Sequence, residues 1–157
     1  MKAFTLVEVL TVIALMGIIG VVSTGLIIDS EDERKFEATL QEMNAIKRGM
    51  IGDPRKVEIG ERVHFGFLGD VGALPTNISD LQSLPGGYTS WTILAAVRFS
   101  HGWNGPYLDD GIPGVDYTTD EWGNAYVWTP GGTPPTLVSY GADGAAGGSD
   151  FDADITI

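Results

Sequence analysis

The sequence predicts an α+β fold in which a long N-terminal helix, apolar in its first half, packs on a small antiparallel β-sheet domain. Three observations predict it. Residues 4–28 form an apolar run that contains one ionisable side chain, Glu8. Residues 29–51 lack proline and place apolar side chains three and four positions apart, which is typical of a helix with one buried face. Residues 125–128 and 136–140 alternate in polarity and flank a loop of proline and glycine, which predicts a β-hairpin.

The apolar run is long enough to cross a bilayer, since about 20 apolar residues suffice for a helix to do so. Lys2 before the run and acidic residues after it predict a cytoplasmic N-terminus and a body on the far side of the membrane. A cleaved secretory signal is disfavoured, because such signals have shorter apolar stretches followed by a small-residue cleavage site. A carboxylate in lipid is costly and usually functional, so Glu8 is a candidate functional residue.

Residues 29–51 should continue the same helix as its amphipathic half. Gly52-Asp53-Pro54 should end it, leaving residues 52–157 as a globular domain. A short helix is expected to start near Thr76, and the apolar residues 91–99 fit either a helix or a strand. The side chains expected on the buried face of the long helix are Phe36, Leu40, Met43, Ala45, Ile46 and Met50.

Composition narrows the function. The formal net charge of −12 argues against nucleic-acid binding, which needs clustered Lys and Arg. The sequence has no cysteine, so no thiolate can act as nucleophile or metal ligand. Ser100 and His101 are adjacent and form no catalytic constellation, so we expect no enzymatic activity. All basic residues lie at or before Arg98, and so residues 99–157 must be solvated, disordered or neutralised by a cation.

The acidic residues gather near the C-terminal end of the sequence. Asp143, Asp150, Asp152 and Asp154 are interleaved with glycines, and calcium prefers such oxygen-rich, flexible loops. The pattern is not an EF-hand, because glycine is missing after Asp154. The residues alone leave two interpretations open, a solvated acidic tail and a calcium site.

The N-terminal residues carry a family resemblance. Lys2-Ala3-Phe4-Thr5-Leu6-Val7-Glu8 resembles the start of type IV pilins and type II secretion pseudopilins, with Ala3 where the family usually has glycine. The resemblance implies that residues 1–3 are a leader. Prepilin peptidase would cut between Ala3 and Phe4, and the new Phe4 amine would be methylated. It also implies that Glu8 pairs with the Phe4 amine of an adjacent copy.

The C-terminal half resembles the major pseudopilins of type II secretion. The similar stretches are Trp103-Asn104-Gly105-Pro106-Tyr107-Leu108, Asp120-Glu121-Trp122-Gly123-Asn124-Ala125-Tyr126, Ser139-Tyr140-Gly141-Ala142-Asp143-Gly144 and Asp152-Ala153-Asp154-Ile155. The resemblance implies a calcium-binding loop over residues 139–157. Its ligands would be Asp143, Asp152 and Asp154, with backbone oxygens near Tyr140 and Ser149.

The function implied by the resemblance is that of a structural subunit of a type II secretion pseudopilus that aids protein export. Copies would wait in the inner membrane with the domain in the periplasm, then polymerise into a periplasmic or extracellular filament. Partners would be other copies, minor pseudopilins, the inner-membrane assembly platform and membrane lipid.

Two alternatives remain open at this stage. One is a type IV pilus subunit for adhesion or motility, although the absence of a disulfide favours the pseudopilin. The other is a membrane-anchored calcium-dependent binding module with a tryptophan platform that includes Trp91 and Trp103. Tryptophans in a small domain more often fill its core.

Overall fold

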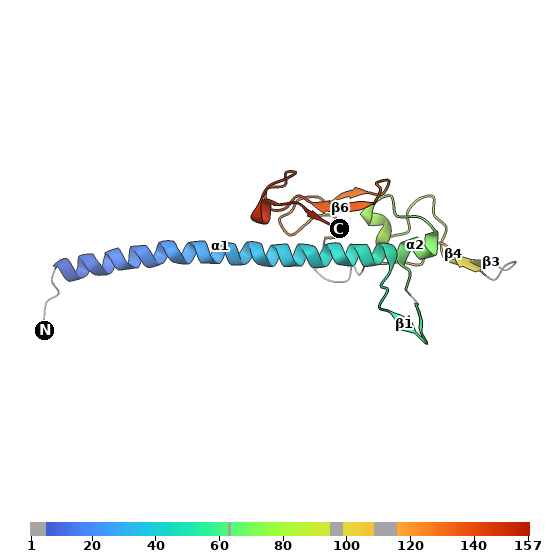
Figure 1. Cartoon of the computed structure of the whole chain (residues 1–157), viewed down its shortest axis with the longest axis horizontal. Helices are drawn as coiled ribbons and strands as arrows, with labels where there is room; N and C mark the ends of the chain where they lie inside the picture. Colours follow the sequence, from blue (N-terminus) through green and yellow to red (C-terminus); the bar gives the residue numbers. More distant parts are fainter. Residues whose placement is uncertain (1–5, 63, 95–98, 109–115) are drawn as a thin grey trace.

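A long helix carries a small, mostly irregular domain along its C-terminal half (Figure 1). The computed structural model describes residues 6–62, 64–94, 99–108 and 116–157, and the side chains of these except for residues 17–30, 62 and 99. Helix α1 (Leu6–Ile51) has 46 residues and is therefore about 70 Å long at 1.5 Å per residue. Its N-terminal part extends beyond the domain (Figure 1).

The C-terminal half of α1 buries the face that the sequence predicts. Met43, Ile46 and Met50 are buried, and the other predicted members of the face pack partly buried against them. The predicted end is also confirmed. Gly52 follows the last residue of α1 with a φ of +79°, and its N–H donates to the Arg48 carbonyl over 2.8 Å. A side chain at Gly52 would overlap the backbone of His64, so the chain can turn back closely only at a glycine.

Three antiparallel strands form the largest sheet, in the order β5-β6-β7. Strand β5 (Val127–Thr129) pairs with β6 (Thr136–Ser139), which pairs with β7 (Ile155–Thr156). The predicted hairpin is therefore confirmed, with Val127 opposite Val138. Alternate residues of β6, Leu137 and Ser139, are buried, as the period-two geometry of a strand requires.

Shorter elements fill residues 57–101. Strand β1 (Val57–Glu58) pairs with β2 (Glu61–Arg62), and helix α2 (Gly66–Val71) follows. The short helix expected near Thr76 is the 3-10 helix η1 (Ile78–Leu81). The apolar segment after residue 91 forms strands β3 (Thr92–Leu94) and β4 (Phe99–His101), so the strand alternative is the correct one. A second 3-10 helix, η2 (Asp150–Asp152), lies in the acidic loop.

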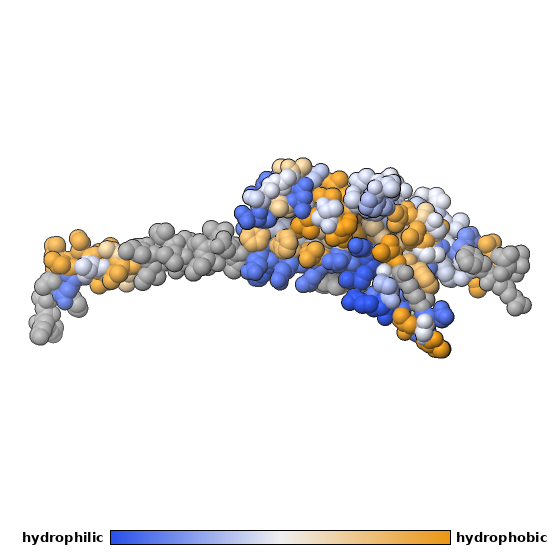
Figure 2. All heavy atoms as spheres, viewed as in Figure 1, coloured by the Kyte–Doolittle hydropathy of each residue, from blue (hydrophilic) through white to orange (hydrophobic). Residues whose placement is uncertain are grey.

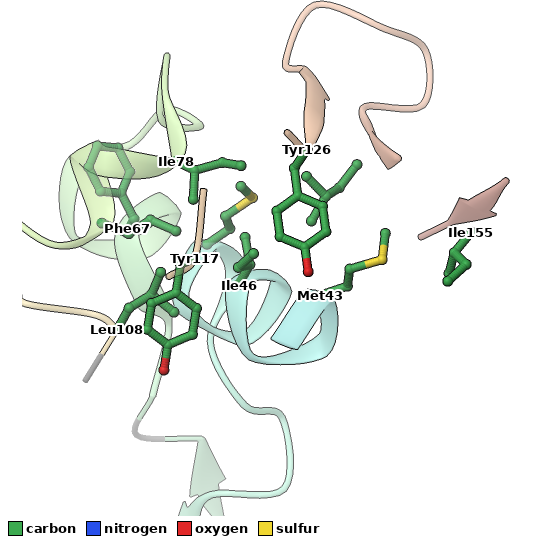
Figure 3. Packing of buried hydrophobic residues seen from close by; sticks show 11 residues of the cluster. Met43, Ile46, Phe67, Ile78, Leu108, Tyr117, Tyr126 and Ile155 are labelled. Atoms are coloured by element: carbon green, nitrogen blue, oxygen red, sulfur yellow. The ribbon is translucent and has the colours of Figure 1, made fainter. Parts of the chain in front are cut away.

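The core lies where α1 meets α2, η1 and the sheet (Figure 3). Phe67 is fully buried, and its ring packs edge-on against Tyr88 and Tyr107 with centroids 5.5 and 5.6 Å apart. The buried hydrophobic side chains are Met43, Ile46, Met50, Phe67, Ile78, Leu81, Leu108, Tyr117, Tyr126, Leu137 and Ile155.

No helix in the part of the chain whose side chains are described is long and apolar enough to cross a membrane. Residues 1–5 lie outside the described residues, as do the side chains of residues 17–30. The membrane-spanning role of residues 4–28 therefore stays a prediction.

Two leucines three positions apart test the core. Leu81 is fully buried in η1, whereas Leu84 just beyond it is 43 % exposed. We expect Leu81→Ala to lower the free energy of unfolding by about 2–5 kcal/mol, because it leaves a cavity. Leu84→Ala should change it by less than about 1 kcal/mol. Chemical denaturation of the full chain in detergent micelles measures both, and equal effects would contradict this packing.

Candidate functional site

The N-terminal turns of α1 present apolar side chains on every side. Leu6, Leu10, Ile13 and Met16 are each at least 60 % exposed, and Figure 2 shows this end of the helix as hydrophobic. A helix that is apolar all round is stable only when another apolar phase covers it. Glu8 lies in the first turn of α1, exposed among these residues. Ala3 and Phe4, the predicted processing residues, lie outside the described residues.

A buried carboxylate organises the loop before β5. Asp120 is only 4 % exposed, and three donors contact it: the Ser139 hydroxyl at 2.6 Å, the Asn124 N–H at 2.8 Å and the Trp122 N–H at 3.1 Å. The Asn124 side chain in turn donates to the Gly141 carbonyl over 2.7 Å. A buried carboxylate is stable only with such partners. Asp120 therefore joins its own loop to β6 and to the start of the acidic loop.

The same loop is attached to α1 by three polar contacts. The Glu121 N–H donates to the buried Thr39 hydroxyl at 3.2 Å, and the Trp122 indole donates to Asp32 at 3.1 Å. The Tyr126 hydroxyl donates to Glu42 at 2.9 Å. These contacts span the amphipathic half of the helix, so they fix the domain's position along it.

Glu42 lies in a weakly solvated acidic environment. Burial raises the pKa of its carboxyl, the Tyr126 hydroxyl opposes that shift, and the charges of Glu121, Asp116 and Asp120 add to it. Burial and the Glu42 charge likewise raise the pKa of Tyr126. Tyr126 therefore stays protonated and keeps donating to Glu42.

His64, Trp103 and Trp128 make structural hydrogen bonds. The buried Nδ1 of His101, by contrast, has no hydrogen-bond partner among the described residues. His64 Nδ1 accepts a hydrogen bond from the Asp53 N–H at 2.9 Å, which joins the two ends of the segment between α1 and α2. The indole N–H groups of Trp103 and Trp128 donate to the carbonyls of Asp80 and Pro75 at 2.9 Å. Both rings pack against the core, whereas Trp91 is 40 % exposed. These placements favour a core role over a ligand-binding platform.

The acidic loop holds its carboxylates by its own backbone. Asp143 accepts the Ala145 N–H at 2.9 Å, and Asp154 accepts the Gly147 N–H at 3.0 Å. The Ala142 N–H donates to the Phe151 carbonyl at 2.8 Å, which closes the two arms of the loop. Phe151 also packs edge-on against Phe36, so the loop is attached to α1 as well.

The donor set of this loop agrees with calcium in kind, because its candidate ligands are all oxygen atoms. A Cβ at Gly141 or Gly148, both with positive φ, would overlap the backbone carbonyls of residues 151–153, so glycine lets the loop close around those oxygens. In the described part of the chain, no three acidic, His or Cys side chains lie close enough to hold a metal ion. A calcium ion here would therefore depend on backbone oxygens beside Asp143, Asp152 and Asp154, including those near Tyr140 and Ser149.

Sequence reasoning missed the role of Asp120, Asn124 and Thr39. The stretch around Asp120 carried the resemblance, yet nothing local showed that its carboxylate would be buried beneath β6. A usable signal was present: an aspartate followed at short spacing by tryptophan, glycine and asparagine is typical of a side-chain-capped turn.

Comparison with known proteins identifies the family. Residues 67–157 match the family described as "Type II secretion system (T2SS), protein G". The match covers more than half of the chain. The chain belongs to this family. This is the family of the type II secretion major pseudopilins, as the sequence resemblance predicts.

Two curated relatives carry the name "Type II secretion system core protein G". The relative from Xanthomonas campestris pv. campestris is 37 % identical over 91 residues, which is 57 % of this chain and 52 % of the relative. The chain thus spans about half the length of that relative. The relative from Pseudomonas aeruginosa is 29 % identical over 159 residues, 98 % of this chain and 92 % of the relative. No solved structure matches the chain.

The polar network around Asp120 joins the matched region to the helix before it. The Asp120 network lies in the matched region, and its partners Thr39 and Glu42 lie on the helix before it. The match favours the secretion pseudopilin over the pilus subunit and the calcium-dependent binding module.

Removing the Asp120 carboxylate tests the network. Asp120→Ala leaves the Ser139 hydroxyl and two backbone N–H groups without their acceptor, and each buried unsatisfied group costs about 1–3 kcal/mol. We expect the free energy of unfolding to fall by at least about 2 kcal/mol. The control is Asp116→Ala, which removes an exposed carboxylate from the same loop and should have a much smaller effect. Thermal unfolding followed by tryptophan fluorescence measures both, and equal losses would contradict the role.

Proposed function

We propose that this pseudopilin polymerises with other copies of itself into a helical pseudopilus that aids protein export. The observation that carries the proposal is the exposed, mainly apolar N-terminal part of α1, which extends beyond the domain (Figure 2). Such a surface needs lipid before assembly and neighbouring helices afterwards. The globular domain would then lie on the outside of the filament.

Glu8 would set the axial register of the filament. In an apolar filament core, a carboxylate needs an opposite charge. The Phe4 amine, released when the leader of residues 1–3 is removed, supplies one on the adjacent copy. Cleavage by prepilin peptidase would therefore license assembly, since the uncut leader occupies the amine. Before assembly the helix would lie in the inner membrane with the domain in the periplasm, and minor pseudopilins and the assembly platform would start the filament.

Calcium binding by the acidic loop is part of the proposal. The support is the family resemblance of residues 139–157, the all-oxygen donor set and the glycine-lined closure of the loop. An ion held by backbone oxygens beside Asp143, Asp152 and Asp154 would offset the mutual repulsion of these carboxylates in a segment without Lys or Arg. It would stabilise the loop against α1, where Phe151 contacts Phe36.

Replacing Glu8 tests the register role. Glu8→Leu should still enter the membrane, because it makes the segment more apolar, but it should reduce filaments at least tenfold because the partner amine loses its carboxylate. Glu37→Leu is the matched control, since it removes an exposed carboxylate from the domain-bearing half of the same helix. Membrane fractionation and electron microscopy of cells that express the assembly machinery measure the two properties. Normal filaments from Glu8→Leu would refute the role.

Calcium titration of the full chain in detergent micelles tests the loop. At a calcium concentration about 100 times Kd, binding adds about 2.7 kcal/mol to the stability of the native state, so the melting temperature should rise. Asp143→Ala and Asp154→Ala should abolish the rise, while Asp116→Ala should retain it. Magnesium at equal concentration should have a weaker effect, because it demands a tighter octahedral shell. An unchanged melting temperature at millimolar calcium would exclude the site.

A further inference from the structure

The tip of the β1–β2 hairpin carries a residue that does not suit the conformation of its turn. Ile59 and Gly60 have φ values of +53° and +84°, as the two central residues of a type I′ turn do. Asparagine followed by glycine is preferred there, and a β-branched residue with positive φ is an outlier. Ile59 is also completely exposed, at 104 % of its reference area. The hairpin therefore displays an apolar side chain at the expense of local stability.

The charges beside the tip are unfavourable as well. Glu58 and Glu61 are exposed and lie directly opposite each other in the β1–β2 register. Like charges in this position destabilise a strand pair. A surface with an apolar pocket and a positive charge would bury the exposed Ile59 side chain and offset the repulsion between Glu58 and Glu61.

The base of the hairpin is held firmly, unlike its tip. Gly52 and Gly66 cross so closely that a Cβ on Gly66 would overlap the backbone of Gly52. The bond from the Asp53 N–H to His64 spans the base, and Asp53 also accepts the Arg55 N–H at 2.9 Å. In Figure 1 the hairpin extends away from α1 on the side opposite β6. The tip is therefore displayed on a fixed support.

A complementary groove lies at the same end of α1. It has a volume of about 430 Å³ and lies between the last turns of α1, the loop before β6, and strands β6 and β7. Its walls are mainly apolar and include Met50, Leu74, Trp128 and Pro134. Lys47, which is exposed, brings a positive charge to the lining.

We propose that Ile59 of one copy inserts into this groove on an adjacent copy, with Glu58 and Glu61 beside Lys47. One chain carries both surfaces of this contact. The first is a knob, the Ile59 side chain flanked by two carboxylates, and the second is the apolar groove with its lysine. Because knob and groove are different surfaces, the contact is heterologous, and a heterologous contact that does not close into a ring generates a helical filament. The contact rests on the proposed polymerisation and names one of its lateral interfaces.

Disulfide trapping tests the contact directly, since the sequence has no cysteine. The double variant Ile59→Cys with Thr156→Cys places one thiol on the tip and one on the exposed edge of the groove. Filaments of the whole variant chain, assembled with the export machinery and then oxidised, should yield a ladder of covalent oligomers. Ile59→Cys with Ser83→Cys is the matched control, because Ser83 is exposed outside the groove, and it should give none.

The outcomes separate the two proposals. Suppose that the wild-type chain forms filaments. If the first cysteine pair then gives no ladder, or if both cysteine pairs give equal ladders, the contact is overturned and the pseudopilus role stays intact. Failure of the wild-type chain to form filaments would overturn the pseudopilus role and the contact that depends on it.

Ile59→Asn separates assembly from folding. Asparagine suits the turn, so the melting temperature of the full chain should stay equal or rise, while filament abundance should fall at least threefold. Leu84→Asn, which changes another exposed apolar residue, should leave assembly unchanged. Lys47→Glu should also weaken assembly, and adding Glu58→Lys and Glu61→Lys should restore it. Wild-type filament abundance in Ile59→Asn, or no restoration by the charge exchange, would overturn the contact.

Discussion

The arrangement of the domain depends on the hydrogen bonds that the buried carboxylate of Asp120 accepts. It accepts hydrogen bonds from its own turn and from Ser139 of β6, while its neighbours in sequence contact Thr39 and Asp32 of α1. In a domain whose strands have two to four residues, few backbone ladders are available to hold the parts together. The side-chain network takes over that role, because a buried charge tolerates few alternative arrangements.

The helix serves two surroundings with two patterns of side chains. Its C-terminal half has one apolar face, and that face is covered by the domain of the same chain. Its N-terminal turns expose apolar side chains around Glu8, and no element in the described part of the chain packs over those apolar side chains. The polar contacts of Asp32, Thr39 and Glu42 lie along this C-terminal half. The contacts that attach the domain thus lie within one copy, and the exposed apolar side chains of the N-terminal turns can contact an external apolar phase.

The parts that could be predicted from the sequence are those with local causes. The buried face of α1 follows from helical periodicity, its end from Gly52, and the β5–β6 hairpin from alternating residues around a proline-rich turn. The placement of Asp120 could not be predicted, because its partner Ser139 is 19 positions away and the contact of Glu121 with Thr39 spans 82. The β1–β2 hairpin could not be predicted either, because its local sequence points away from a tight turn. Its turn carries isoleucine where local preference would place asparagine.

Local preference is violated at few places, and these places are informative. In the described part of the chain, the non-glycine residues with positive φ are Ile59 and Asp150. Each such residue costs about 1–3 kcal/mol and persists only when its surroundings hold it there. Ile59 lies on the firmly based hairpin, and Asp150 lies at the start of η2 in the acidic loop. A chain that folds by local consistency elsewhere thus departs from it at the two surfaces for which an external partner is proposed, a second copy at the hairpin and a cation at the loop.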